Sequence, residues 1–312
     1  MMSRIVLMGE CMAELLQLET GLLQQSFAGD VFNTAVYLKR AFPQLDTCLL
    51  TAVGQDSLSD SMVDFFAQEN IDTQFICRSP DKIPGLYWIK TDAQGERSFT
   101  YWRNDSAARQ VLRLLTTTHI EKIAQAEYFF FSGISLAVIP AADRDLLWLL
   151  LARLKEAGVK IVFDPNYRSR LWGNPEEAKV NFDQAFGFSD LLLPGVDDFM
   201  QLYGLNTIES INDFLSKYSV SEVVVKNGPE ELCLLREGKI HRYAITPVSN
   251  VVDTTSAGDS FNGVYLGAKM AGIAGERALA LAAKSAAVVI QHRGAIIPAP
   301  IFQEFWTEAL IS

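Results

Sequence analysis

The sequence has few of the residues that build metal clusters or disulfide frameworks. It holds four cysteines and three histidines in 312 residues, and no two cysteines are spaced as Cys-x-x-Cys. This spacing argues against a structural zinc module, and no protein-borne metal site is predicted. Scattered single cysteines favour free, buried thiols in a reducing cytoplasm.

Long apolar runs and basic clusters are also missing. No run reaches the roughly 18 apolar residues of a membrane-spanning helix, so no membrane partner is expected. The chain enters a strand-like segment at residues 4–8 without a cleavable signal pattern. A net charge of −10 without a basic block argues against a nucleic-acid partner. We therefore expect a cytoplasmic protein that acts on small molecules.

Two common nucleotide-binding loops are absent as well. A dinucleotide site needs Gly-x-Gly-x-x-Gly after the first strand. Only Gly9 stands there, and the following Glu10 would repel a pyrophosphate. The Walker loop Gly-x-x-x-x-Gly-Lys-Ser/Thr is also missing. These absences exclude a dinucleotide-dependent dehydrogenase and a Walker-type NTPase.

Strand-like and helix-like segments alternate through most of the chain. The predicted strands are 5–8, 48–53, 128–132, 160–164, 191–193 and 222–226. The predicted helices are 33–42, 57–70, 144–157, 260–270 and 276–291. Continuous apolar strands separated by helices predict an α/β fold, with a mostly parallel central sheet and helices on both faces.

One segment breaks this alternation. Residues 85–89 and 98–103 read as two strands joined by a turn at 92–95, and residues 13–27 can add further strands to the same unit. A small β unit beside an α/β core suggests a lid over a site. We expect a single domain, 1–312, whose lid comprises about 11–27 and 83–104.

The most informative motif runs from Asp253 to Asp259, as Asp-Thr-Thr-Ser-Ala-Gly-Asp, just ahead of a helical pattern. Its small residues let the backbone of Ser256, Ala257 and Gly258 approach a ligand and direct N–H groups at an anion. Asp259 then places a carboxylate beside that anion. This pairing suits transfer of a phosphoryl group to a hydroxyl. A well-capped helix is the alternative interpretation.

Two further groups of residues offer contacts to a hydroxylated ligand. Gly29 precedes a helix, and Asp30 and Asn33 can bond hydroxyls, although ordinary helix initiation explains them too. In the predicted lid, Tyr101 and Arg103 are two apart and share one strand face. An aromatic ring beside a guanidinium suits the carboxylate of a sugar acid, while a solvated lid face is the alternative.

Together these motifs resemble the PfkB/ribokinase family of sugar kinases, over residues of about 5–300. The family motif usually reads Asp-Thr-Thr-Gly-Ala-Gly-Asp, and Ser256 here replaces its first glycine. The resemblance implies a ribokinase-like fold, ATP as phosphoryl donor and Mg²⁺ as its companion. It also implies that Asp259 is the catalytic base, and that Gly29, Asp30 and Asn33 contact the sugar.

The segment 163–172 and the closing 293–298 resemble the branch of this family that phosphorylates 2-keto-3-deoxygluconate. This implies a sugar acid held near Arg103 and Arg168, whose terminal hydroxyl is the acceptor. The substrate-binding residues so implied are completed by Tyr87 and Tyr101. The ATP-binding residues so implied are Asn166, Arg168, Lys226, Gly228, Ser256, Ala257 and Gly258.

Several points stay open at this level. Glu14 stands where many relatives carry a substrate-binding Asp. The family's Asn-x-x-Glu is replaced by residues 194–198, so either Asp197 or Asp198 can serve the magnesium. A monovalent-cation site near Asp253 and a homo-oligomer joined through the lid edges are also left open by the resemblance.

Other functions remain as alternatives. Fructose, ribose or 2-keto-3-deoxygalactonate can replace the proposed sugar. Ser135, in Gly-Ile-Ser-Leu-Ala after a strand, is one residue short of a nucleophile elbow, and with Asp164 and His241 or His292 it could form a hydrolase triad. A non-catalytic sugar sensor on the same fold is the third alternative.

Overall fold

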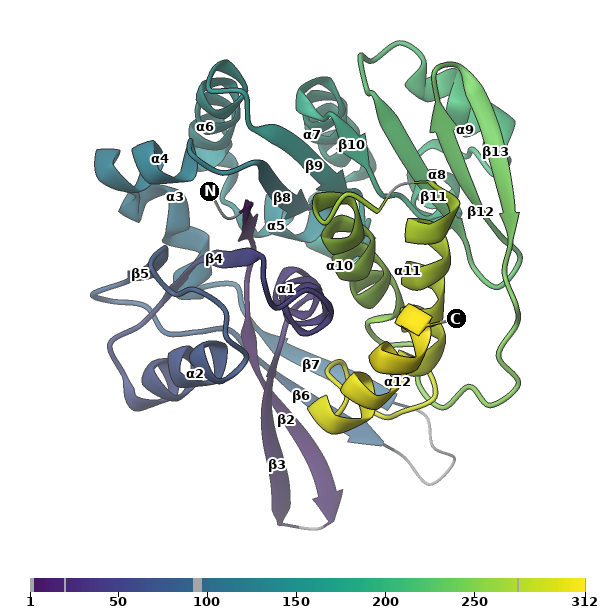
Figure 1. Ribbon diagram of the computed structural model, residues 1–312. Coiled ribbons are helices and arrows are strands. Elements are labelled where there is room, and N and C mark those ends of the chain that lie inside the picture. Colours follow the sequence, from purple (N-terminus) through teal and green to yellow (C-terminus); the bar gives the residue numbers. More distant parts are fainter. Residues whose placement is uncertain (1–2, 20, 92–96, 274, 312) are drawn as a thin grey trace.

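The computed structural model describes residues 3–311, apart from residues 20, 92–96 and 274. A nine-stranded sheet with the order β13-β12-β11-β10-β9-β8-β1-β4-β5 forms its centre (Figure 1). The pairing is parallel from β5 to β11, whereas β12 pairs antiparallel with both of its neighbours, β11 and β13. The strands are β1 (Arg4–Met8), β4 (Asp46–Val53), β5 (Ile76–Arg78), β8 (Tyr128–Ser132), β9 (Lys160–Asp164), β10 (Leu191–Leu192), β11 (Glu222–Asn227), β12 (Glu231–Arg236) and β13 (Lys239–Ala244). The predicted mostly parallel sheet is confirmed.

Helices cover both faces of this sheet (Figure 1). They are α1 (Asp30–Ala41), α2 (Ser57–Gln68), α3 (Val111–Leu114), α4 (Thr117–Ile123), α5 (Gly133–Val138), α6 (Arg144–Glu156), α7 (Pro175–Phe188), α8 (Val196–Tyr203), α9 (Ile208–Leu215), α10 (Ala257–Met270), α11 (Glu276–Val289) and α12 (Ala299–Ile311). Within the described ranges, no helix has both the length and the apolar character that a membrane crossing requires.

Strand alternation creates a separate core on each face of the sheet. Along β1, Ile5 and Leu7 join the core beneath α1, α10, α11 and α12. Val6 and Met8 point the other way, into the core beneath α6 to α9. All of the four cysteines are free and buried, as predicted. Burial on both faces explains why these strands read as continuous apolar runs.

Two of the predicted helices begin earlier than their apolar pattern suggests. α1 starts at Asp30, where the amide of Asn33 donates to the carbonyl of Gly29 over 2.7 Å. α10 starts at Ala257, directly after Ser256 in the left-handed conformation (φ 65°). Both starts therefore fall inside the two motifs. The first turn of α1 already buries Val31 and Phe32, whereas α10 begins with the small residues Ala257 and Gly258.

A second, four-stranded sheet with the order β3-β2-β6-β7 projects from the central body (Figure 1). Its strands are β2 (Met12–Glu19), β3 (Leu22–Ala28), β6 (Leu86–Thr91) and β7 (Arg97–Trp102). β6 pairs antiparallel with β7, as predicted, and β2 pairs in parallel with β6. The turn predicted at 92–95 lies outside the described residues.

Candidate active site

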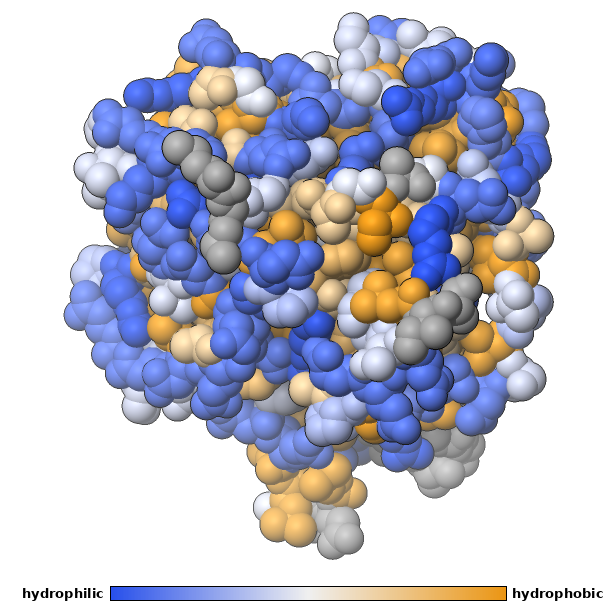
Figure 2. Space-filling view, in the orientation of Figure 1, coloured by the Kyte–Doolittle hydropathy of each residue, from blue (hydrophilic) through white to orange (hydrophobic). Residues whose placement is uncertain are grey.

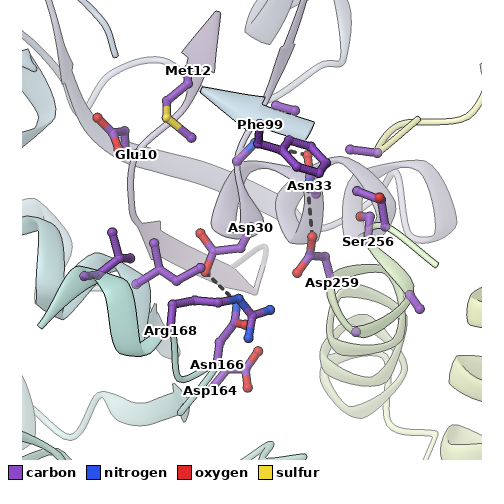
Figure 3. A pocket seen from close by; sticks show the side chains of 18 of the residues that line it. Glu10, Met12, Asp30, Asn33, Phe99, Asp164, Asn166, Arg168, Ser256 and Asp259 are labelled. Carbon is purple, nitrogen blue, oxygen red and sulfur yellow. Dashed lines mark hydrogen bonds between the residues drawn. The ribbon is translucent and has the colours of Figure 1, made fainter. Parts of the chain in front are cut away.

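The two sequence motifs meet in one cavity of about 520 Å³ between the central sheet and the second sheet (Figure 3). It lies beyond the carboxyl ends of β1 and β9, where open α/β sheets place their ligands. The sequence-predicted residues that line it are Gly29, Asp30, Asn33, Tyr87, Tyr101, Arg103, Asn166, Arg168, Lys226, Ser256, Ala257, Gly258 and Asp259. Residues more than 200 positions apart thus share one site.

A second cavity of about 570 Å³ adjoins the first. Both are lined by Asp197, Lys226, Thr254, Ala257 and Gly258. The rest of the second lining is mainly apolar and includes Gly228, Leu232, Ile245, Val248, Val251, Phe261 and Ile290. Two ligands can therefore lie end to end, one in each cavity, and meet at the start of α10.

The predicted anion site at this junction has fewer free amide donors than the sequence suggests. The amide of Ala257 donates to the carbonyl of Thr254 over 3.3 Å, so that donor is partly engaged within the chain. Among the hydrogen bonds of the described residues, none is donated by the main-chain N–H of Ser256 or Gly258. These two amides, at the positive end of α10, are therefore available to donate to an anion.

Asp259 is held at the junction by a residue from the other motif. Asn33 donates through Nδ2 to Oδ2 of Asp259 over 2.9 Å (Figure 3). Burial, followed by the charge of Asp30, raises the pKa of Asp259 to about 7, and the Asn33 hydrogen bond opposes this rise. Asp30 has its own pKa raised, first by burial, and accepts from Asn166 Nδ2 over 3.0 Å. A carboxyl that titrates near neutrality can serve as a general base.

The two neighbouring acids Asp197 and Asp198, left open as magnesium ligands by the sequence, have different surroundings. Asp198 accepts from the amide of Tyr167 over 2.7 Å and from that of Gly195 over 2.8 Å, so both of its oxygens hold backbone. Burial, followed by the charge of Asp164, raises its pKa to about 6. Its neighbour Asp197 is exposed and lines both cavities. Asp197 is therefore the more available of the two carboxylates for a cation.

A polar cluster beneath the junction joins β9, β11 and α10. Lys226 Nζ lies 3.5 Å from Asp164 Oδ1 and donates to Asn262 Oδ1 over 3.0 Å. Asn262 in turn donates to Asp164 Oδ2 over 2.7 Å. Sequence reasoning missed Asn262, although its position three residues after Asp259 on a helix places the two on one face.

On the side of the second sheet, Arg103 is paired with an acid that sequence reasoning did not assign to the site. Its Nη2 forms an ion pair with Oε2 of Glu10, which follows β1, and Ser106 donates to the other oxygen of Glu10. The Arg103 side chain is only 9% exposed, and its Nε has no hydrogen-bond partner in the structure. That nitrogen remains as a donor for a ligand in the cavity.

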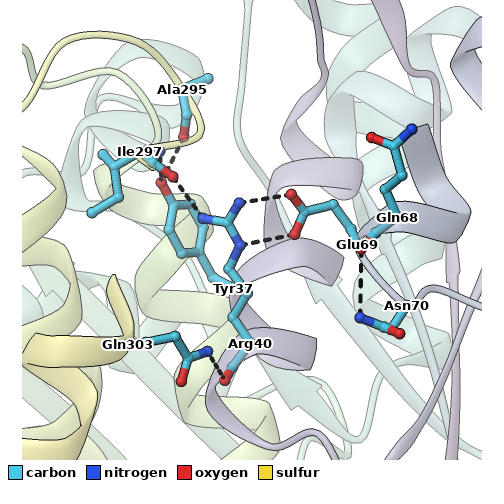
Figure 4. Close-up of polar contacts among 8 residues, drawn as sticks. All are labelled: Tyr37, Arg40, Gln68, Glu69, Asn70, Ala295, Ile297 and Gln303. Atoms are coloured by element: carbon cyan, nitrogen blue, oxygen red, sulfur yellow. Dashed lines mark hydrogen bonds and ion pairs between the residues drawn. The ribbon is translucent and has the colours of Figure 1, made fainter. Parts of the chain in front are cut away.

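The loop before α12 is fixed against α1 (Figure 4). The Tyr37 hydroxyl donates to the carbonyl of Ala295 over 2.9 Å and accepts from the amide of Ile297 over 3.1 Å. Arg40 donates to the carbonyl of Ile297 over 2.6 Å and pairs with Glu69 at 2.7 Å. This network holds Ala295 in the cavity wall.

The remaining predictions divide as follows. Asn166 and Arg168 line the first cavity and not the second. A nucleotide in the second, apolar cavity would therefore not lie against these two residues, although the sequence predicted that contact.

The Ser135 hydroxyl donates to the carbonyl of Met8 over 2.9 Å and completes the capping box of α5 with Ser132. His292 instead faces the carbonyl of Val288. The hydrolase alternative is therefore wrong, because the hydroxyl of Ser135 is used within the fold.

Comparisons with known proteins agree with this geometry. The family model for pfkB family carbohydrate kinases matches residues 2–301. A 2-dehydro-3-deoxygluconokinase of Escherichia coli K12 is 39% identical over 308 residues, covering 96% of this chain and 98% of that enzyme. The crystal structure of a Thermotoga maritima 2-dehydro-3-deoxygluconokinase superposes with a TM-score of 0.83 at 22% identity, covering 98% of this chain and 99% of that one.

A further solved structure, that of an E. coli protein under the name ribokinase II in complex with ATP and Mg²⁺, gives a TM-score of 0.85 at 20% identity. It covers 98% of this chain and 100% of its own. At these identities the two structures show the fold, which is ribokinase-like.

Proposed function

The chain belongs to the pfkB family of carbohydrate kinases, and we propose that it transfers the γ-phosphoryl group of ATP to 2-keto-3-deoxygluconate, also named 2-dehydro-3-deoxygluconate. The single observation that carries this proposal is the junction of the two cavities. There, two free amides and a carboxyl of raised pKa stand between a polar cavity and an apolar one. The choice of sugar follows from the relatives at 39% identity, which are named 2-dehydro-3-deoxygluconokinases.

In the proposed reaction, the sugar acid lies in the polar cavity with its terminal hydroxyl, the C6 oxygen by resemblance, at Asp259. Asp259 accepts the hydroxyl proton while that oxygen bonds to the γ-phosphorus and the bond from phosphorus to ADP breaks. The amides of Ser256 and Gly258 stabilise the charge of the transferring group. Asn33 keeps the Asp259 carboxylate pointing into the site.

The nucleotide is proposed for the second cavity. Its apolar lining, with Val251, Phe261 and Ile290, suits a purine ring, and Gly228 permits a close approach of the backbone. Lys226 lines both cavities, and its ammonium group, 3.5 Å from Asp164, can donate a hydrogen bond to a phosphate at the junction. Mg²⁺ would neutralise polyphosphate charge, and the exposed oxygens of Asp197 fit that hard cation better than those of Asp198.

The acidic end of the sugar is proposed to meet Arg103 and Arg168 under the second sheet, with Tyr87 and Tyr101 as aromatic walls. We propose that the whole chain works as one kinase unit in which this sheet is the lid. A lid that excludes water limits hydrolysis of ATP.

Three finer points are proposed on separate observations. Asp253 links the loop before α12 to the start of α10, because it accepts from the amides of Gly294 (2.8 Å) and Thr255 (3.1 Å). A monovalent cation bound beside Asp253 would influence the position of the first turn of α10.

The second point is the location of the protein. The buried free thiols suit a reducing cytoplasm.

Self-association through the lid is the third point. Leu18, Leu22 and Leu23 are exposed near the tip of the β2–β3 pair, where Figure 2 shows an apolar patch. β3 and β7 are the lid's edge strands, and such edges can pair with a second copy. Light scattering after gel filtration tests this point, and a concentration-independent monomer would contradict it.

The proposed function is tested by a coupled assay of ATP consumption with a panel of sugars. The panel comprises 2-keto-3-deoxygluconate, 2-keto-3-deoxygalactonate, fructose and ribose. We expect the highest kcat/KM with 2-keto-3-deoxygluconate. A higher value with a neutral sugar would change the substrate, and binding without turnover of any sugar would favour a sensor.

A further inference from the structure

The positive charges that line the first cavity are not equally available. Arg103 is paired with Glu10, and Lys226 lies within 3.5 Å of Asp164. Arg168 donates to the carbonyl of Tyr167, and Arg170 to the hydroxyl of Tyr101, both of which are uncharged partners. Among the described residues, Arg168 and Arg170 form no ion pair. The free positive charge of the cavity therefore comes from these two residues.

Arg170 also bridges the central body and the lid. It belongs to the short helix η3 (Ser169–Leu171), which follows the loop after β9. Its Nη2 donates to the Tyr101 hydroxyl over 2.7 Å, and its guanidinium carbon lies 4.3 Å from the centre of the Tyr101 ring. A planar guanidinium can make both contacts and still direct further N–H groups elsewhere.

This contact ends a continuous row of side chains across the lid. Ser26, Glu14, Tyr87 and Tyr101 stand opposite one another on β3, β2, β6 and β7. Ser26 donates to Glu14 over 2.8 Å, Tyr87 donates to the other oxygen of Glu14, and the rings of Tyr87 and Tyr101 stack at 5.6 Å. The row orients the Tyr101 ring, and the hydrogen bond and ring contact with Tyr101 place the exposed Arg170 side chain at the cavity.

We propose that Arg170 is a specificity-determining residue that reads the carboxylate of the sugar acid together with Arg168, while it holds Tyr101 over the substrate. The inference rests on the proposed function and deepens it. Arg103 then contributes a directional hydrogen bond from Nε, because Glu10 already neutralises its charge. Two guanidinium groups of a single loop supply the net attraction for an anion.

The test compares Arg170→Gln, which loses the charge, with Arg170→Lys, which keeps the charge but loses the planar stack. KM for 2-keto-3-deoxygluconate, KM for ATP and kcat are measured, and sugar-acid binding is measured by calorimetry. For Arg170→Gln we expect KM for the sugar acid to rise about 10- to 100-fold, as for a lost charge-assisted contact. KM for ATP and kcat should stay within about twofold of the native values. KM for the sugar acid in Arg170→Lys should lie between that of the native chain and that of Arg170→Gln.

Arg153→Gln is the matched control, since Arg153 is an exposed arginine of α6 that does not line the cavity. An unchanged KM for the sugar acid in Arg170→Gln would overturn the inference and leave the proposed function intact. Equal rises in both KM values would also overturn it, because they indicate a general structural role. If the native chain neither binds nor phosphorylates the sugar acid, the proposed function fails first and the inference fails with it.

Discussion

Asn33 on α1 and Asp259 on α10 are joined by a hydrogen bond of 2.9 Å, although 226 residues separate them in the chain. Each belongs to one of the two sequence motifs. The bond favours the ionised form of Asp259, whereas burial and the charge of Asp30 disfavour it. The balance leaves a carboxyl that titrates near neutral pH, next to the free amides of Ser256 and Gly258.

The first prediction concerns pH. Since protonated Asp259 cannot accept a proton, kcat/KM should fall tenfold per unit below pH of about 7. Asn33→Ala removes a hydrogen bond to the ionised form, so this acidic limb should move upward by about one unit. Initial rates from pH 5 to 9 provide the measurement. A limb that stays in place would show that Asn33 does not set the pKa of the base.

The second prediction concerns stability. The pKa of Asp259 in the folded protein, about 7, exceeds the ordinary 3.8. Ionisation of Asp259 therefore lowers the free energy of unfolding, and this loss is complete above about pH 7 and fades as the pH falls towards 3.8. Asp259→Asn should therefore raise the free energy of unfolding by about 1–3 kcal/mol at pH 8, with a smaller gain at pH 5. Urea titrations at both pH values test this. An equal gain at both would contradict the assigned pKa.

The third prediction concerns the contact that brings the two motifs together. Gly263 on α10 lies against α1, and a Cβ there would stand 2.4 Å from the carbonyl oxygen of Thr34. Gly263→Ala should cost about 1–3 kcal/mol through overpacking, and it should lower kcat because Asn33 and Asp259 separate. Gly187→Ala on α7 is the control, since a Cβ there meets nothing within 4 Å. Loss of stability in both variants would point to another cause.

The fourth prediction concerns the pair of Arg103 and Glu10. Arg103→Ala should raise KM for 2-keto-3-deoxygluconate more than KM for fructose, because it removes a donor for the carboxylate. It also strands Glu10, so stability should fall by about 3–5 kcal/mol. Adding Glu10→Gln should restore much of the stability without restoring the KM. Equal losses for the acidic and the neutral sugar would show that Arg103 does not distinguish them.

The parts of the fold that were predictable are those with a strong local pattern. Strands such as β8 and β9 are buried on both faces and read as unbroken apolar runs. α7 was not predicted because its apolar stripe is weak. Its buried face includes the polar Asn181 among alanine and phenylalanine side chains. The β12–β13 hairpin was missed because its turn residues Glu237 and Gly238, both at positive φ, place Glu where such turns usually have Asn, Asp or Gly.

The site shows the same division. The motif residues from 29–33 and 256–259 were predicted because local conformation and chemistry coincide there. The partners of Arg103 and Tyr101 were not, because Glu10 and Arg170 reach them only through tertiary contacts. The use of the Ala257 amide within the chain also depends on the turn geometry and not on residue type.

The most direct test of the account is steady-state kinetics of Asp259→Asn beside the native chain, with 2-keto-3-deoxygluconate and ATP. The substitution keeps the shape of the side chain and the acceptor for Asn33, but it removes the base. We expect kcat to fall by about 10² to 10⁴, with KM for ATP within about twofold of the native value. A kcat close to native would contradict the central claim that Asp259 takes the proton of the accepting hydroxyl.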